Sequence, residues 1–195
     1  MLSIILASAQ EPNILAMMEE TEACFPAAQI IVSNDRYRLG KGWAIREALS
    51  EATGDIIVFI DGDGDISPKM INRLLPHLDE FDIVVGTKNT RRLLSRWILS
   101  GLARVYISVM FGIPVDTQTG IKVFKRSALP MWEANSFAFP VEILAKAQGA
   151  KMFEVMIETR AARKMKLKSI FAALIGSIKI WGRLNARRIS SDDES

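Results

Sequence analysis

Three aspartates at alternate positions form the part of the sequence best suited to chemistry: Asp61, Asp63 and Asp65. They follow the hydrophobic run at residues 56–60 directly, and single glycines between them let the chain turn tightly and let a ligand approach. Carboxylates this close repel one another, and a bound cation relieves that repulsion. Oxygen ligands suit Mg²⁺ or Mn²⁺, which commonly keep waters and bridge substrate phosphates. The cluster therefore predicts a metal–diphosphate site with these three carboxylates as the metal ligands.

Two other interpretations of the aspartate cluster compete with a metal site. An EF-hand calcium loop fails, because Ile66 stands where its glycine should be and Asn72 where its bidentate glutamate should be. A plain acidic turn without a ligand stays open as the alternative.

The composition excludes several other kinds of catalytic site. The chain has 195 residues, of which 49% are hydrophobic and 24% charged, so it suits one folded domain and not a disordered protein. A single cysteine, Cys24, excludes a disulfide framework and a cysteine zinc cluster, and a single histidine, His77, argues against a Ser-His-Asp triad. Any catalysis must then come from carboxylates, cations and a hard metal ion. The net charge of +3 is small, so the placement of the basic residues matters more than their number.

Strand and helix patterns alternate over the first 90 residues. Parallel strands covered by helices are typical of such an alternation, which predicts an α/β sheet. Ligands of these sheets bind at the carboxyl ends of the strands, and the aspartate cluster follows a strand directly. The expected strands are Ser3–Ala7, Ala28–Val32, Asp55–Ile60 and Asp82–Val85, the last ended by Gly86, and the expected helices are Asn13–Cys24, Trp43–Thr53 and Pro68–Leu78, with a glycine-bracketed loop at Gly40–Gly42.

Together, these motifs resemble a known family. Their order is similar to that of family 2 glycosyltransferases, which have the Rossmann-like nucleotide-diphosphosugar (GT-A) fold with flanking helices. Within that family the chain most resembles the dolichyl- and polyprenyl-phosphate hexose (glucose or mannose) synthases, in a short form without their C-terminal membrane domain. The resemblance spans residues 3–160 and rests on Ser3–Ile14, Gln29–Asp35, Gly40–Leu49 through Asp61–Asp63, Val85–Lys88 and Asp116–Lys125.

The resemblance implies a donor site. Glu11, Asn34 and Asp35 would border the nucleobase and ribose, while Asp61 and Asp63 would sit on the diphosphate and its metal. Asp65 stands where family members often have a glutamine as a further ligand. The implied donor-binding residues are Ala7, Glu11, Asn34, Asp35, Lys41, Gly42, Asp61 and Gly62, and the implied catalytic residues are Asp61, Asp63 and Asp116.

The resemblance also implies an acceptor side. A lipid phosphate is already ionised and needs no general base, so the difficulty is to bring two anions together, and cations after a strand end would screen their repulsion. A solvated basic turn is the alternative. If the acceptor is a hydroxyl, Asp116 is the only evident base, unless it merely caps its loop. The implied acceptor-phosphate residues are Lys88, Arg91, Arg92, Arg96 and Lys122.

The sequence departs from the family pattern in the nucleotide pocket. Ala9 replaces an aromatic residue and Gln10 an asparagine, and only Arg36–Gly40 stand where the family has a longer turn, helix and strand. The string Asp116–Gly120 is closer to the glucosyl branch, which favours UDP-glucose over GDP-mannose.

A C-terminal segment, residues 161–189, is expected to form a basic amphipathic helix at a membrane surface, after a glycosyltransferase domain at residues 1–160 and before a disordered tail at residues 190–195. A helix packed on the core is the alternative, and Leu93–Gly112 is expected to be either a core helix or the floor under a lipid tail. No stretch is long and apolar enough for a conventional membrane span. The apolar stripe comprises Leu167, Ile170, Phe171, Leu174, Ile178 and Trp181, opposite Lys168, Lys179, Arg183 and Arg187.

The combined expectation is a metal-dependent inverting glycosyltransferase that uses Mg²⁺ or Mn²⁺. It would move a hexose from a nucleotide-sugar to a polyprenyl or dolichyl phosphate, as a peripheral protein on the cytoplasmic face of a membrane. A homo-oligomer could equally cover the apolar surfaces, and no nucleic-acid partner is expected because no aromatic platform accompanies the basic residues. A transferase with a hydroxyl acceptor and a non-catalytic nucleotide-sugar-binding protein are the alternatives.

Overall fold

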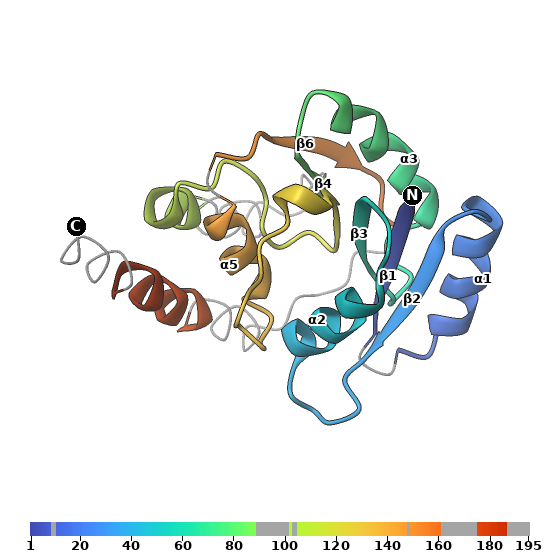
Figure 1. Ribbon diagram of the computed structural model, residues 1–195, viewed down its shortest axis with the longest axis horizontal. Coiled ribbons are helices and arrows are strands. Elements are labelled where there is room, and N and C mark those ends of the chain that lie inside the picture. The colour runs from blue at the N-terminus through green and yellow to red at the C-terminus, as the bar shows by residue number, and fades with distance from the viewer. Residues whose placement is uncertain (9–10, 89–101, 103–104, 148, 161–174, 187–195) are drawn as a thin grey trace.

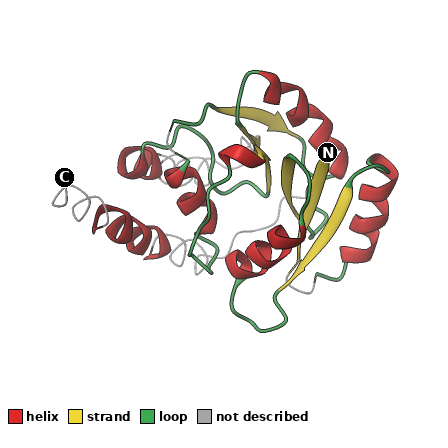
Figure 2. Cartoon of the chain, in the orientation of Figure 1, coloured by secondary structure: helices red, strands yellow, loops and turns green. Residues whose placement is uncertain are grey.

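A computed structural model of the chain describes residues 1–8, 11–88, 102, 105–147, 149–160 and 175–186. Six strands form one mixed sheet with helices on both faces (Figures 1 and 2). The strands are β1 (Leu2–Ser8), β2 (Gln29–Asn34), β3 (Ile56–Asp61), β4 (Ile83–Lys88), β5 (Ile121–Lys125) and β6 (Met152–Ile157). The helices are α1 (Ile14–Cys24), α2 (Lys41–Glu51), α3 (Ile71–Leu74) and α5 (Phe139–Lys146), with 3-10 turns at Pro68–Met70, Leu75–Asp79 and Arg126–Ala128 and further helical residues at 105–111 and 175–186.

The sheet topology brings several loops to one edge. The strand order is β2-β1-β3-β5-β4-β6, and every neighbouring pair is parallel except those of β5, which runs antiparallel to β3 and β4. The carboxyl ends of β1, β2, β3 and β4 therefore share an edge with the loop that precedes β5. The prediction that the aspartate cluster lies at this edge is confirmed.

Both faces of the central strands are buried, as the apolar sequence of β1 and β3 requires. Successive residues alternate between faces: Ile5 and Phe59 join the core under α2 and α5, while Ile4 and Val58 join the core under α1 and α3. Each such side chain stabilises the fold by roughly 1.5–3 kcal/mol. The sheet is thus a rigid platform for the loops at its carboxyl edge, and the predicted α/β fold is confirmed.

Gly86 does not end its strand, contrary to the sequence prediction, because β4 continues to Lys88. A Cβ on Gly86 would lie 2.4 Å from Cγ2 of Ile121 on the adjacent β5. The glycine is therefore required by close packing between strands and not by a turn.

Two predicted helix boundaries are also wrong. Helix α2 begins at Lys41, so the glycine-bracketed segment forms its first turn and not a separate loop. The helix expected over Pro68–Leu78 is broken into a 3-10 turn, one α-helical turn and a second 3-10 turn. Pro76 lies in the second 3-10 turn and has no backbone N–H to continue an α-helix.

The predicted C-terminal amphipathic segment is described only at residues 175–186, which are helical. Its other residues and the tail at residues 190–195 lie outside the described part of the chain. Within the described part, no helix has both the length and the apolar character needed to cross a bilayer.

Candidate active site

An ion pair between Lys41 and Asp61 marks the centre of the carboxyl edge. Asp61 is the last residue of β3, pairs in register with Ala7, and donates its N–H to the Gly120 carbonyl at 2.8 Å. The Lys41 ammonium contacts Oδ1 of Asp61, and the two side chains are 21% and 31% exposed. A carboxylate and an ammonium therefore meet in a half-buried position where a ligand can still reach both.

The first turn of α2 delivers Lys41 to this position. Gly40 precedes the helix with φ of +111°, a conformation that residues with a Cβ rarely adopt. The ring centre of Phe137 lies 5.9 Å from Nζ of Lys41. The lysine is thus directed by a backbone bend that only glycine accommodates readily.

The turn that carries Asp63 and Asp65 is held by one hydrogen bond within it and by two backbone hydrogen bonds to neighbouring segments. The Gly62 N–H donates to the Ala7 carbonyl at 2.9 Å, and the Asp65 N–H donates to Oδ1 of Asp63 at 3.0 Å. The carbonyl of the buried Asp65 accepts the Arg160 N–H at 2.8 Å. This turn is therefore preorganised beside the ends of β1 and β3.

The fit of a metal ion depends on the donor atoms of this turn. In the described residues, no group of three or more histidine, cysteine or acidic side chains is arranged to hold a metal. The three-aspartate ligand set thus stays a prediction. Mg²⁺ is usually held by one or two carboxylates together with substrate phosphates, not by a complete protein cage. Asp61 and Asp63, with carboxylate oxygens at a ligand-accessible edge, fit such a partial site.

Asp116 organises its own loop. Its Oδ1 accepts the Gln118 N–H at 2.8 Å, and its Oδ2 accepts the Thr119 hydroxyl at 2.8 Å. Its N–H donates to the Glu154 carboxylate. These contacts match the loop-capping alternative for Asp116. Its predicted catalytic role stays a prediction.

Lys122 lies buried beneath this loop, where its Nζ donates to the Thr119 carbonyl. Burial lowers the pKa of Lys122 from 10.5 to about 8, against the opposing influence of the Asp116 and Asp61 carboxylates and with added repulsion from Lys41 and Lys88. The same interactions show that the fold gathers these five predicted residues around one region. A buried ammonium there raises the local positive potential.

The predicted nucleotide-side residues lie at the same edge. Asp35, just after β2, accepts the N–H groups of Leu39 and Gly40 at 2.7 and 3.0 Å and so caps its own short loop. Asn34 is exposed at the end of β2, and the Glu11 N–H donates to the hydroxyl of Ser8 at 3.2 Å. Their contacts with a nucleotide stay predictions.

The predicted acceptor cations are described in part. Lys88 ends β4 in a half-buried position, and Lys122 is placed as above. Arg91, Arg92 and Arg96 lie outside the described residues.

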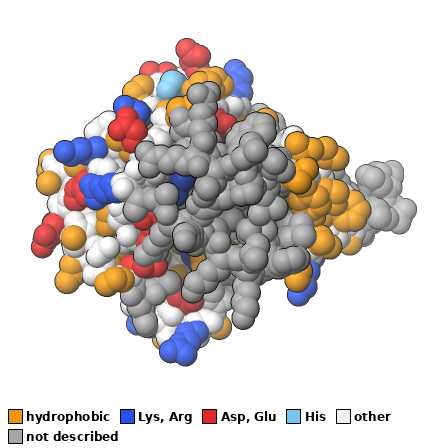
Figure 3. Space-filling model, turned by 180° about the vertical axis from the view of Figure 1, so that it is seen from behind, with side chains coloured by type: hydrophobic (Ala, Val, Ile, Leu, Met, Phe, Trp, Pro, Cys, Tyr) orange, Lys and Arg blue, Asp and Glu red, His pale blue; other side chains and the backbone are white. Residues whose placement is uncertain are grey.

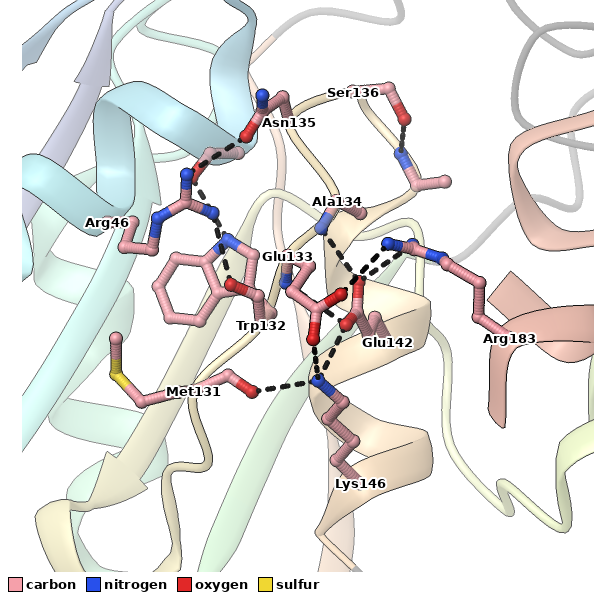
Figure 4. Close-up of polar contacts among 12 residues, drawn as sticks. Arg46, Met131, Trp132, Glu133, Ala134, Asn135, Ser136, Glu142, Lys146 and Arg183 are labelled. Carbon is pink, nitrogen blue, oxygen red and sulfur yellow. Dashed lines mark hydrogen bonds and ion pairs between the residues drawn. The ribbon is translucent and has the colours of Figure 1, made fainter. Parts of the chain in front are cut away.

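Residues that the sequence did not single out form a cluster around the segment at residues 132–135, which packs against the first turn of α2. Figure 4 shows the buried Glu142 of α5 between Lys146 and Arg183, and Arg46 of α2 against the segment that contains Trp132 and Asn135. The sequence offers one local signal, the pair Glu142 and Lys146 at a spacing of four residues on the same helix. The other partners, the N–H groups of Glu133 and Ala134 and the guanidinium of Arg183, come from other segments and form no motif with Glu142.

Comparisons with known proteins identify a family, curated relatives and solved structures that this chain resembles. The family model for glycosyl transferase family 2 matches residues 4–106. The chain is 29% identical to dolichyl-phosphate beta-glucosyltransferase ALG5D of Trichomonas vaginalis over 184 residues, which cover 81% of this chain and 56% of the relative. It is 27% identical to ALG5C of the same organism over 183 residues, which cover 82% and 54%. The chain thus spans about half the length of the curated relatives it matches.

Solved structures show the same fold. Glucosyl-3-phosphoglycerate synthase from Mycobacterium tuberculosis, in complex with Mn²⁺, uridine diphosphate and phosphoglyceric acid, matches with a TM-score of 0.70 and 18% identity, over 93% of this chain and 78% of that chain. A mycobacterial protein matches with a TM-score of 0.73 and 18% identity, over 93% and 74%. At these identities the similarity establishes the fold, and the expected GT-A architecture is confirmed.

Proposed function

Because this chain belongs to glycosyl transferase family 2, we propose that it transfers glucose from UDP-glucose to a polyprenyl or dolichyl phosphate with the help of Mg²⁺ or Mn²⁺. The observation that carries the proposal is the Lys41–Asp61 pair at the carboxyl edge, next to Asp63 and the buried Lys122. A nucleoside diphosphate is bound best where cations and carboxylates that can hold a metal ion lie together, and this edge has ammonium and carboxylate groups side by side.

Each residue has a role in the proposed transfer. Asp61 and Asp63 would hold the metal ion, which when bound neutralises charge on the diphosphate. Lys41 would contact the diphosphate from the α2 side, where it already meets Asp61. As the bond from the sugar to the diphosphate breaks, negative charge grows on the leaving group, and preorganised cations stabilise it. Attack from the opposite face would invert the anomeric centre.

The donor assignment rests on the relatives. The curated relatives are named dolichyl-phosphate beta-glucosyltransferases, and one structural neighbour was solved with UDP-glucose and Mn²⁺. These names favour a uridine nucleotide and glucose for this chain. GDP-mannose is the alternative donor.

A phosphate acceptor agrees with the contacts around Asp116. Both of its carboxylate oxygens already accept hydrogen bonds from its own loop, so it is poorly placed to take a proton from a hydroxyl acceptor. A phosphate needs no base and is attracted by the cations Lys88 and Lys122 at this edge. The same contacts disfavour the hydroxyl-acceptor alternative.

A lipid acceptor also requires a membrane-facing surface. Exposed apolar side chains gather at the end of the molecule that carries the helical residues 105–111 and 175–186 (Figure 3). We propose that this end associates peripherally with the membrane, on the cytoplasmic face. The exposed apolar residues are Leu102, Val105, Val109, Ile175, Ile178 and Trp181.

The experiment is a transfer assay with radiolabelled UDP-glucose, Mn²⁺ and a polyprenyl phosphate. Replacing Asp61 or Asp63 by Asn removes a charged ligand at constant size, and we expect kcat to fall about 10²–10³-fold while the melting temperature stays within a few degrees. Asp79→Asn, an exposed acid at the opposite edge, is the matched control and should keep full activity. Unchanged metal-dependent turnover in both site variants would contradict the assignment.

A further inference from the structure

We propose that Glu142 is a positioning residue of the donor site, which acts through residues 132–135 on the first turn of α2 and thereby on Lys41. This inference rests on the proposed function. Glu142 makes no polar contact with Lys41 or Asp61, so its influence must pass through the intervening segment. A continuous series of close contacts joins Glu142 to Gly40 and Gly42, the residues on either side of Lys41.

Residues 132–135 form hydrogen bonds with the backbone of the first turn of α2. The Gly42 N–H donates to the Asn135 carbonyl at 2.8 Å, and the indole N–H of the buried Trp132 donates to the Gly42 carbonyl at 3.0 Å. A Cβ at Gly40 would lie 2.3 Å from the Asn135 carbonyl oxygen, and one at Gly42 would lie 2.1 Å from that of Ala134. Two glycines therefore let this segment press directly on the residues either side of Lys41.

Arg46, one helical turn further along α2, forms two more hydrogen bonds with the same segment. Its Nη1 donates to the Trp132 carbonyl at 3.0 Å, and its Nη2 donates to Oδ1 of Asn135 at 3.0 Å (Figure 4). A planar guanidinium that makes two such bonds fixes orientation as well as distance. Helix α2 and residues 132–135 thus behave as one unit.

Glu142 fixes the other side of residues 132–135. Its carboxylate is 2% exposed and accepts the N–H groups of Glu133 and Ala134 at 3.0 and 2.8 Å. It is also paired with Lys146 at 2.8 Å and with Arg183 at 3.3 Å (Figure 4). A buried carboxylate with four donors is held in one position, and it holds its donors there in turn.

These contacts persist at neutral pH. Burial would raise the pKa of Glu142, but the hydrogen bonds from Lys146 and from the two backbone N–H groups outweigh it and hold the pKa below its usual range. The Glu142 carboxylate therefore remains charged at neutral pH. Loss of that charge would release residues 133 and 134 and, through them, the turn that carries Lys41.

Arg183 extends the chain of contacts to the C-terminal helical residues. Its guanidinium meets both Glu142 and Glu133, at 3.3 and 3.4 Å. The neighbouring Ile180 and Ser177 are buried against the body of the protein. The Glu142 carboxylate therefore contacts both the C-terminal helical residues 175–186 and the segment that packs on the first turn of α2.

The experiment measures binding of UDP with Mn²⁺ to the full chain by calorimetry, well below the melting temperature of each variant. In Glu142→Gln we expect Kd to rise about tenfold, and the donor KM to rise in parallel while kcat changes less than about threefold, because a misplaced Lys41 weakens donor binding first. A merely structural role would lower the melting temperature and leave Kd of the folded protein unchanged. A Kd within about twofold of the unmodified chain would overturn the proposal.

Arg46→Ala is the second variant, in case Glu142→Gln fails to fold. Arg46 is partly exposed, and its replacement removes two hydrogen bonds to residues 132–135. We expect Kd to rise about three- to tenfold. Arg46→Lys should recover part of the affinity. An unchanged Kd in Arg46→Ala would again overturn the proposal.

Arg73→Ala is the matched control. It breaks a 3.0 Å ion pair with Glu158, outside this chain of contacts, and should leave Kd unchanged. Failure of the unmodified chain to bind UDP would contradict the proposed function itself. Binding by the unmodified chain with no effect in Glu142→Gln and Arg46→Ala would contradict only the positioning role.

Discussion

At the scale of single residues, the Asp61 carboxylate is confined from two sides. Lys41 contacts one oxygen, and a Cβ built on Gly120 would lie 2.1 Å from the other. The glycine before β5 is therefore needed for space, since a methyl group there would push the carboxylate out of its place. The aspartate was predictable from its motif, whereas the role of this glycine appears only once β5 is placed beside β3.

Gly120→Ala tests this confinement. We expect donor affinity to fall about tenfold or more, because the added methyl displaces the carboxylate, while the flexible side chain yields enough for the fold to survive. UDP binding measured by calorimetry checks the expectation. Gly182→Ala is the control, since a Cβ there meets nothing within 4 Å. Equal affinity in both variants would show that Asp61 is not sterically confined.

Lys122 links charge to stability at the same edge. Its pKa falls from 10.5 to about 8 on folding, chiefly through burial. Between these two values the unfolded chain binds more protons than the folded one, so stability rises as the pH rises. Below pH 8 both states are protonated, and the cost of the buried ammonium is fully present. A charge kept at such a cost agrees with a role in binding anions.

Lys122→Met should remove that cost. We expect the variant to be more stable at pH 7, by on the order of 1–3 kcal/mol, and weaker in UDP binding. Its stability advantage should shrink as the pH rises from 8 towards 10, because the lysine then loses its charge in the folded protein. Urea titrations at several pH values measure this difference. A constant advantage over that range would contradict the depressed pKa.

At the scale of elements, the sequence predicted the strands and helices that depend on local residue patterns. The apolar runs and glycines were sufficient to identify β1, β2, β3, β4 and helices α1 and α2, within a few residues at each end. The antiparallel insertion of β5 between β3 and β4 was not predictable, because it depends on pairing between distant segments. The Glu142 contacts escaped prediction for the same reason: the carboxylate and its partner Arg183 are brought together only by the fold.

Arg126 holds the carboxyl end of helix α2 at the edge of the sheet opposite the candidate site. It donates to the carbonyls of Gly54 and Ala52 at 2.6 and 2.7 Å, just past the carboxyl end of α2. A cation held beside the carboxyl end of a helix stabilises that end.

Arg126→Ala should therefore affect the fold and not the site. We expect a loss of about 1.5–3 kcal/mol in the free energy of unfolding, because two carbonyls lose a charged donor. The Kd for UDP should stay the same, since these contacts lie away from the carboxyl edge. Urea denaturation and calorimetry provide the two measurements. A large loss of UDP affinity would mean that the two edges are coupled.

At the scale of the whole molecule, the charged edge and the apolar end serve different substrates in the proposed reaction. Among the predicted apolar stripe, Ile178 and Trp181 are 52% and 41% exposed, whereas Ile180 is buried against the core. The C-terminal helical residues thus pack on the protein through one side and present apolar side chains on another. Such a surface is typical of proteins that bind a membrane interface.

Ile178→Glu with Trp181→Glu tests this surface. Adding two charges to an interfacial apolar face should lower partitioning onto anionic phospholipid vesicles about tenfold or more. Vesicle sedimentation measures the bound fraction. Leu15→Glu on α1, where the leucine is 70% exposed, is the matched control and should bind as the unmodified chain does. Equal binding by all three proteins would favour a protein partner, such as a second copy, at this end.

The central claim is that the carboxyl edge between β1, β3 and the first turn of α2 holds the diphosphate of a nucleotide-sugar. The most direct measurement is a crystal structure of the full chain grown with UDP and Mn²⁺. We expect the metal on Asp61 or Asp63 and the diphosphate within reach of Lys41. Nucleotide bound instead at the opposite edge, near Asp82 and Lys146, would contradict it.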